Sequence, residues 1–139
     1  MEENKKKEKF YAGGFLYNSE KNEVLLHKRD GNTPYYPHKW SFFGGLNESN
    51  ETPEQCCVRE WKEELNIEVP SKDLIPLCDY LNTEQNTWRY AFYYPCQIEK
   101  SEMTLGEGAD FDWIPIKKVF EYDLSRWAKQ DLEVFAKKI

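Results

Sequence analysis

The segment that decides the fold is residues 45–67, with the sequence GLNESNETPEQCCVREWKEELNI. It predicts a helix over residues 52–65. Thr52 provides an N-cap, and Gln55 three residues later completes a capping box. Asn66 suits the left-handed residue that commonly ends a helix. A helix with two defined ends therefore follows a loop that begins at a pair of glycines.

Charged side chains gather on one side of this helix. At about 100° per residue they lie within about 140° of one another. They are Arg59, Glu60, Glu63 and Glu64. Like charges at this spacing repel, and the last turn of a helix disfavours negative charge. Clustered carboxylates suit a hard divalent cation, Mg²⁺ or Mn²⁺, which binds phosphates and can activate a water. A solvated acidic surface is the alternative.

The composition is that of one folded domain. The 139 residues are 40% hydrophobic and 16% aromatic, which argues against disorder. The net charge of −6 disfavours nonspecific binding to nucleic acid polymers or anionic membranes. No stretch approaches the roughly 20 apolar residues of a membrane span, and the charged residues 1–8 do not look like a secretion signal. We expect a single domain over residues 1–139, with a loose tail at residues 1–8, in a cytoplasmic protein whose four cysteines are reduced.

The other elements are predicted from apolar stretches and turn residues. Residues 10–17 and 24–29 read as a hairpin around a turn at 18–22, and residues 40–43 as a short strand that ends at the glycine pair. Further strands are expected around residues 74–81, 88–98 and 111–116. Apolar residues at helical spacing from Leu124 to Ile139 predict a final helix, capped by Asp123 or Ser125. This mixture predicts an α/β fold, a mixed β-sheet flanked by helices.

Residues 45–67 resemble the Nudix box. That signature runs Gly, five residues, Glu, seven residues, then Arg-Glu-apolar-any-Glu-Glu-any-Gly-apolar. All of its charged positions match, from Glu51 to Glu64. The departures are a bulky apolar Trp61 and Asn66 in place of the usual Gly. The chain is identified as a member of the Nudix hydrolase family, and the resemblance implies a Nudix-like α/β/α sandwich.

The resemblance also implies an activity. It is the Mg²⁺-dependent cleavage, with Mn²⁺ possible, of a diphosphate linkage in a nucleoside triphosphate or another nucleoside diphosphate derivative. Glu60, Glu63 and Glu64 become the metal-binding and catalytic carboxylates, with the Gly44 carbonyl completing the metal shell. Arg59 would orient one of the helix glutamates. The binding partner is then a nucleotide, and a homodimer is left open.

Outside the box, the loop that follows residue 106 resembles one in enzymes that sanitise oxidised nucleotides. Glu107 stands at the position of that loop's glutamate, as a further metal ligand and catalytic group; a surface turn residue is the alternative. Arg29 stands where related enzymes hold a phosphate or base. The aromatic rings that can stack on a base include Trp40 and Trp88, although each could equally belong to the core.

Two other functions stay open at this point. One is a Nudix-fold nucleotide-binding or regulatory module without turnover, which a loss of box glutamates would have favoured; none is lost. The other is a family isomerase acting on isoprenyl diphosphates, for which no second cluster of metal-binding His and Cys residues is found. The sequence does not decide which glutamate is the general base.

Overall fold

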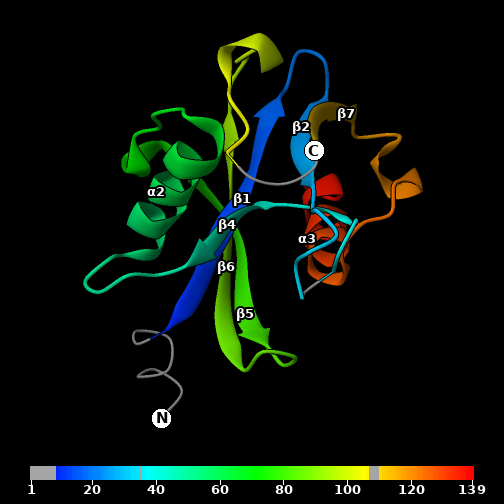
Figure 1. Ribbon diagram of the computed structural model, residues 1–139. Coiled ribbons are helices and arrows are strands. Elements are labelled where there is room, and N and C mark those ends of the chain that lie inside the picture. Colours follow the sequence, from blue (N-terminus) through cyan, green and yellow to red (C-terminus); the bar gives the residue numbers. More distant parts are fainter. Residues whose placement is uncertain (1–8, 35, 107–109) are drawn as a thin grey trace.

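The computed structural model describes residues 9–34, 36–106 and 110–139. Its strands form one mixed sheet with a helix on either side (Figure 1). The strands are β1 (Phe10–Asn18), β2 (Glu23–Lys28), β3 (Trp40–Ser41), β4 (Phe43–Leu46), β5 (Ile75–Asn82), β6 (Thr87–Pro95) and β7 (Asp110–Pro115). The helices are α2 (Pro53–Leu65) and α3 (Arg126–Ala136), with short 3-10 turns at Ser71–Asp73, Lys100–Glu102 and Val119–Glu121.

Strand β1 is the centre of the sheet. It pairs in parallel with β6 along residues 10–17, with Phe10 opposite Trp88. Because β6 takes one whole edge, β4 and β2 share the other, both antiparallel. The first half of β1 pairs with β4, where Gly13 lies opposite Gly44, and its last residues pair with β2. The glycine pair of the box is thereby fixed beside the middle strand.

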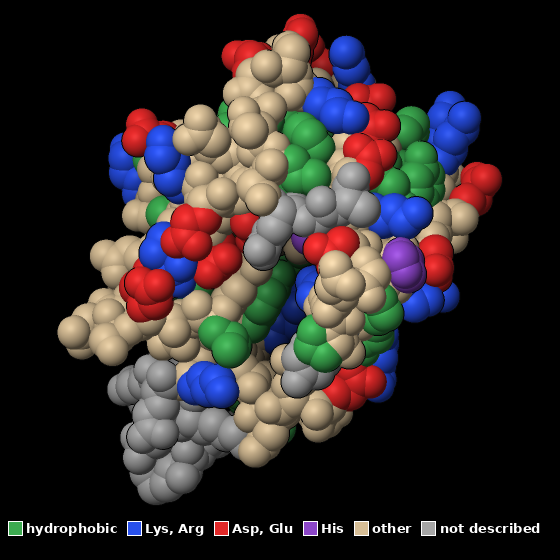
Figure 2. All heavy atoms as spheres, viewed as in Figure 1, with side chains coloured by type: hydrophobic (Ala, Val, Ile, Leu, Met, Phe, Trp, Pro, Cys, Tyr) green, Lys and Arg blue, Asp and Glu red, His purple; other side chains and the backbone are tan. Residues whose placement is uncertain are grey.

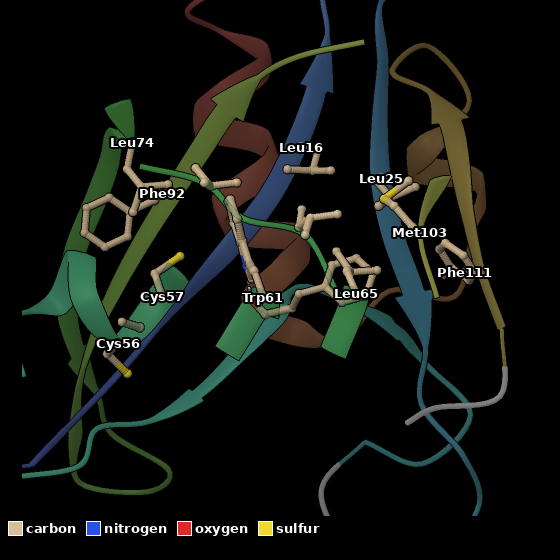
Figure 3. Close-up of a cluster of buried hydrophobic side chains, with 14 of the residues drawn as sticks. Leu16, Leu25, Cys56, Cys57, Trp61, Leu65, Leu74, Phe92, Met103 and Phe111 are labelled. Atoms are coloured by element: carbon tan, nitrogen blue, oxygen red, sulfur yellow. Dashed lines mark hydrogen bonds between the residues drawn. The ribbon is translucent and has the colours of Figure 1, made fainter. Parts of the chain in front are cut away.

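Two hydrophobic clusters fill the space between the sheet and the helices. Trp61 and Leu65 of α2 pack against Phe10 and Leu16 of β1 on one face, as Figure 3 shows for the labelled residues. On the other face, α3 packs against Phe15 and other residues of the strands. The expected α/β/α sandwich is confirmed.

The helix α2 has the ends that its sequence predicts. The Thr52 hydroxyl accepts a hydrogen bond from the Gln55 backbone N–H, and the Gln55 side chain accepts one from the Thr52 N–H. Asn66 ends the helix in the left-handed conformation, with a φ of 57°. Neither α2 nor any other helix in the described part of the chain is long and apolar enough to cross a membrane.

Three expected boundaries are wrong. The strand over residues 40–43 is two strands, because Trp40–Ser41 pairs with β2 whereas Phe43–Leu46 pairs with β1; the glycine pair lies inside β4. The strand expected to reach residue 98 ends at Pro95. The final helix ends at Ala136 and leaves Ile139 exposed. The Ser125 side chain makes no cap and instead donates to the Ser41 hydroxyl at 3.1 Å.

Candidate active site

Arg59 joins the acidic residues of α2 to the loop before the helix. Its Nε and Nη2 donate to the two carboxylate oxygens of Glu51 at 2.6 and 3.1 Å. Its Nη1 donates to Glu60 at 3.0 Å and to Glu63 at 2.9 Å. The hydrogen bond from Arg59 holds the pKa of the Glu51 carboxyl below its usual range. One guanidinium therefore offsets the repulsion among three carboxylates and fixes the loop on the helix.

Glu60 lies against the backbone of Gly45. A Cβ atom at Gly45 would stand 2.6 Å from the Glu60 carboxylate, so this approach requires glycine. The Glu60 side chain is 17% exposed. Burial raises the pKa of its carboxyl, and the nearby Arg59 opposes that rise. The result is a carboxylate held close to the backbone of β4.

Glu64 is buried, although its place on the helical wheel groups it with Glu60 and Glu63. Its Oε1 accepts a hydrogen bond from the Gly44 N–H at 3.0 Å. Three residues earlier on the helix, the Trp61 indole N–H donates to the Phe43 carbonyl at 2.9 Å. These two contacts attach α2 to β4, so the glycine pair and the acidic residues form one unit.

The donor chemistry of this unit fits a hard divalent cation, since it offers carboxylate oxygens on a rigid helix beside a backbone carbonyl. Within residues 9–34, 36–106 and 110–139, however, no three His, Cys, Asp or Glu side chains converge as a metal cluster. The reason lies in their present partners: Arg59 holds Glu60 and Glu63, and Glu64 binds Gly44. A cation would have to replace Arg59 at the first two carboxylates.

Glu107 lies outside the described residues. Its neighbour Gly106 is described, and the Gly106 N–H donates to the Glu64 carbonyl at 2.7 Å. A Cβ atom at Gly106 would stand 2.6 Å from the Glu63 carbonyl oxygen. The chain therefore reaches the last turn of α2 immediately before Glu107.

A cleft of about 240 Å³ begins at the glycine pair of β4, Gly44 and Gly45. Gly44 and Gly45 line it together with Tyr11 and Arg89 from the neighbouring strands β1 and β6. Figure 2 shows a hollow in the middle of this face, with hydrophobic and basic side chains inside it and an acidic group to one side. The acidic residues of α2 and the cleft thus meet at β4.

Of the three residues expected to bind substrate outside the box, only Arg29 lines this cleft. Trp88 is buried in the core, where its indole N–H donates to Asp79 at 2.9 Å. Trp40 packs edge-on against the ring of Tyr122. Neither tryptophan is among the residues that line the cleft.

Sequence reasoning missed a buried ion pair at the cleft. The Arg89 Nε lies 3.1 Å from Asp131 Oδ2 of α3, and the two side chains are 8% and 0% exposed. The Tyr80 hydroxyl donates to the other oxygen of Asp131 at 2.7 Å. The guanidinium also lies over the Tyr11 ring, 4.5 Å from its centre. One signal was present, since Arg89 is the single charged residue in the apolar stretch of β6.

The family can now be decided by comparison. The NUDIX domain profile matches residues 8–137, almost the whole chain. The chain belongs to the Nudix hydrolase family. Members of this family are hydrolases of diphosphate bonds, and they generally use divalent metal ions. The Nudix box of this chain is the segment in which Arg59, Glu60 and Glu64 contact β4.

Relatives of this Nudix chain carry different substrate names. A dihydroneopterin triphosphate diphosphatase of Haemophilus influenzae is 26% identical, covering 80% of this chain and 77% of its own. A prenyl-diphosphate phosphatase of Methanosarcina mazei is 21% identical, covering 81% and 72%. The crystal structure of a MutT protein from M. mazei superposes with a TM-score of 0.75 at 23% identity, covering 93% of each chain, which shows the shared fold.

Proposed function

We propose that this Nudix hydrolase is a Mg²⁺-dependent pyrophosphohydrolase that cleaves a diphosphate linkage in a nucleoside triphosphate or another nucleoside diphosphate derivative. The observation that carries the proposal is the junction at β4. There, Gly44 contacts the buried Glu64, Gly45 contacts the half-buried Glu60, and both glycines also line the cleft. A substrate in that cleft has its reacting phosphates next to the carboxylates. The similarity of this chain to the dihydroneopterin triphosphate diphosphatase of H. influenzae, which is named for a triphosphate substrate, supports the proposal.

Glu60, Glu63, Glu64 and the Gly44 carbonyl would hold the cation in this proposal, with Glu107 as a further ligand or base. Once bound, a divalent cation neutralises charge on the diphosphate oxygens and makes a bound water more acidic. The protein fixes the positions of the carboxylates that would hold the cation. The Gly44 N–H holds Glu64, which is buried and cannot turn to solvent. Until a cation replaces it, Arg59 donates hydrogen bonds to Glu60 and Glu63 and orients both on the same side of the helix.

The activity is tested with a panel of nucleoside triphosphates, dinucleoside polyphosphates, nucleotide sugars and prenyl diphosphates. Each compound is incubated with the protein and Mg²⁺, Mn²⁺ or Ca²⁺, and released phosphate and pyrophosphate are measured. We expect Mg²⁺-dependent hydrolysis of at least one base-bearing compound. Ca²⁺ should support turnover poorly because it accepts a looser geometry. Binding without turnover would instead support a regulatory module, and hydrolysis of prenyl diphosphates alone would refute a nucleotide substrate.

Metal binding is tested without catalysis, by thermal unfolding in a Mg²⁺ titration. A cation that binds the folded chain and relieves the repulsion among Glu60, Glu63 and Glu64 raises the melting temperature. The Glu63→Gln variant should lose most of this increase. Glu133→Gln is the matched control, because it removes the charge of an exposed glutamate on α3. Equal increases in the parent and in Glu63→Gln would remove Glu63 from the proposed site.

A further inference from the structure

Trp61 stands where the Nudix box usually has an aliphatic residue, and it brings a hydrogen-bond donor into the core. Its side chain is fully buried in the cluster between α2 and the sheet (Figure 3). An aliphatic side chain would fill this space without any polar atom. A buried indole N–H needs an acceptor, and here the acceptor is the Phe43 carbonyl, 2.9 Å away. Trp61 therefore does more than fill the core.

The acceptor of Trp61 belongs to the same peptide group as the donor that holds Glu64. The Phe43 carbonyl and the Gly44 N–H are the two ends of one peptide bond. Its oxygen accepts from Trp61, and its N–H donates to Glu64 Oε1 at 3.0 Å. The bond is trans, as are the others in the described residues, so its C=O and N–H point in opposite directions. Two side chains of α2 thus hold this peptide plane at both ends and oppose its rotation.

The backbone around this peptide has few side chains to hold it in place. Gly13 and Gly14 of β1 lie opposite Gly44 and Phe43 of β4. A Cβ atom at Gly13 would overlap the Phe43 carbonyl oxygen, and one at Gly44 would stand 2.5 Å from the Ala12 carbonyl oxygen. The close approach of the two strands therefore requires glycine, which has more backbone conformations available than any other residue. The hydrogen bond from Trp61 offsets this freedom at the segment that carries the Gly44 carbonyl.

We infer that Trp61 is a positioning residue for the proposed metal site. Its indole N–H fixes the Phe43–Gly44 peptide, and the fixed peptide places two groups of Gly44. These are the N–H that holds Glu64 and the carbonyl, which is the next polar group along the chain. The inference rests on the proposed function, in which this carbonyl and Glu64 hold the cation. Removal of a group that orients metal ligands typically lowers metal affinity or activity by about 10- to 100-fold.

The first test needs neither metal nor substrate. Hydrogen exchange of the Gly44 amide is followed by NMR in the metal-free parent and in Trp61→Phe, which keeps an aromatic ring but loses the donor. One hydrogen bond corresponds to about a fivefold shift in an opening equilibrium. Gly44 should therefore exchange at least about fivefold faster relative to the amides of β6, the strand on the other edge of β1. An unchanged relative exchange rate would refute the inference.

Trp113→Phe is the matched control. The Trp113 indole N–H also donates to a backbone carbonyl, that of Ile98, at 3.1 Å, and the ring packs against the same hydrophobic cluster. Trp113 lies on β7, which pairs with β2. This variant should also melt at a lower temperature, because it loses the same kind of hydrogen bond. The relative exchange rate of Gly44 should nevertheless equal that of the parent.

The second measurement is the Mn²⁺ dissociation constant, determined by electron paramagnetic resonance without nucleotide. It should rise by at least about 10-fold in Trp61→Phe and stay close to the parental value in Trp113→Phe. A loss of stability alone would raise it equally in both variants. An equal change in the two variants, or no change in Trp61→Phe, would refute the inference.

Replacement of Trp61 by benzothienylalanine separates the hydrogen bond from the packing, because sulfur takes the place of the indole N–H in a ring of nearly the same shape. This variant should weaken Mn²⁺ binding as Trp61→Phe does, and it provides the test if Trp61→Phe does not fold. Parental Mn²⁺ affinity would show that only the ring volume matters, which would refute the inference while leaving the hydrolase proposal in place. A parent protein that binds no Mn²⁺ and hydrolyses no compound of the panel would instead refute the proposed function.

Discussion

The Gly45→Ala variant should move the Glu60 carboxylate while leaving the stability of the fold almost unchanged. The new Cβ atom would lie 2.6 Å from the Glu60 carboxylate, whereas ordinary contacts begin at 3.4 Å, so the carboxylate must move by about 0.8 Å. The group that moves is the end of a flexible side chain, so we expect a loss of unfolding free energy under about 1 kcal/mol. A displacement near 1 Å at a reacting centre lowers turnover by about 100-fold. Metal-dependent kcat/KM should fall accordingly, with an almost unchanged melting temperature.

Gly44→Ala is the matched comparison on the adjacent residue. Its Cβ atom would meet backbone, 2.5 Å from the Ala12 carbonyl oxygen and 2.6 Å from the Gly13 Cα. Backbone cannot move aside cheaply, so this variant should lose about 1–3 kcal/mol and melt roughly 3–10 °C lower. Circular dichroism melts and steady-state kinetics on both variants provide the test. Parental turnover in a folded Gly45→Ala protein would refute the reasoning that the place of Glu60 matters.

Three further predictions concern single side chains. Glu64→Gln should keep the fold, since its amide oxygen can still accept a hydrogen bond from the Gly44 N–H, but it should lose metal-dependent turnover. Glu64→Ala should lose turnover as well, and it should be about 1–3 kcal/mol less stable than the parent in urea unfolding. Burial lowers the pKa of His27 to about 4. The unfolded chain therefore binds a proton that the folded chain refuses, and stability should fall by about 2 kcal/mol from pH 7 to pH 5, a difference that His27→Gln removes in urea titrations at the two pH values. Glu107→Gln should fold normally and lose roughly 100-fold in turnover; a near-parental rate would exclude Glu107 from the chemistry.

The features predictable from the sequence are those set by local chemistry. The ends of α2 follow from Thr52, Gln55 and Asn66, whose hydrogen bonds span only three or four residues. The hairpin of β1 and β2 follows from two apolar stretches around a turn. The resemblance to the box also implied Arg59 as a partner of the helix glutamates, and Arg59 contacts Glu60 and Glu63 in the structure.

The features that escaped prediction depend on partners distant in the sequence. A helical wheel cannot tell that β4 packs beside Glu64 and buries it, because Gly44 comes from another element. The division of residues 40–46 into two strands depends on which edge each half meets, β2 or β1. Arg89 and Asp131 are 42 residues apart, and neither position by itself indicates an ion pair.

The central place of β1 also governs the order in which the molecule can assemble. During synthesis β1 leaves the ribosome before the other strands of the sheet, but its parallel partner β6 emerges only after α2 and β5. Pairings between such distant segments form slowly, because the long intervening chain must be ordered first. Asp131, the counter-ion of Arg89, lies on α3 and emerges after all of these strands. We therefore expect nascent chains to hold an unpaired arginine and an incomplete cleft until α3 has been made, so that substrate cannot guide the earlier steps of folding.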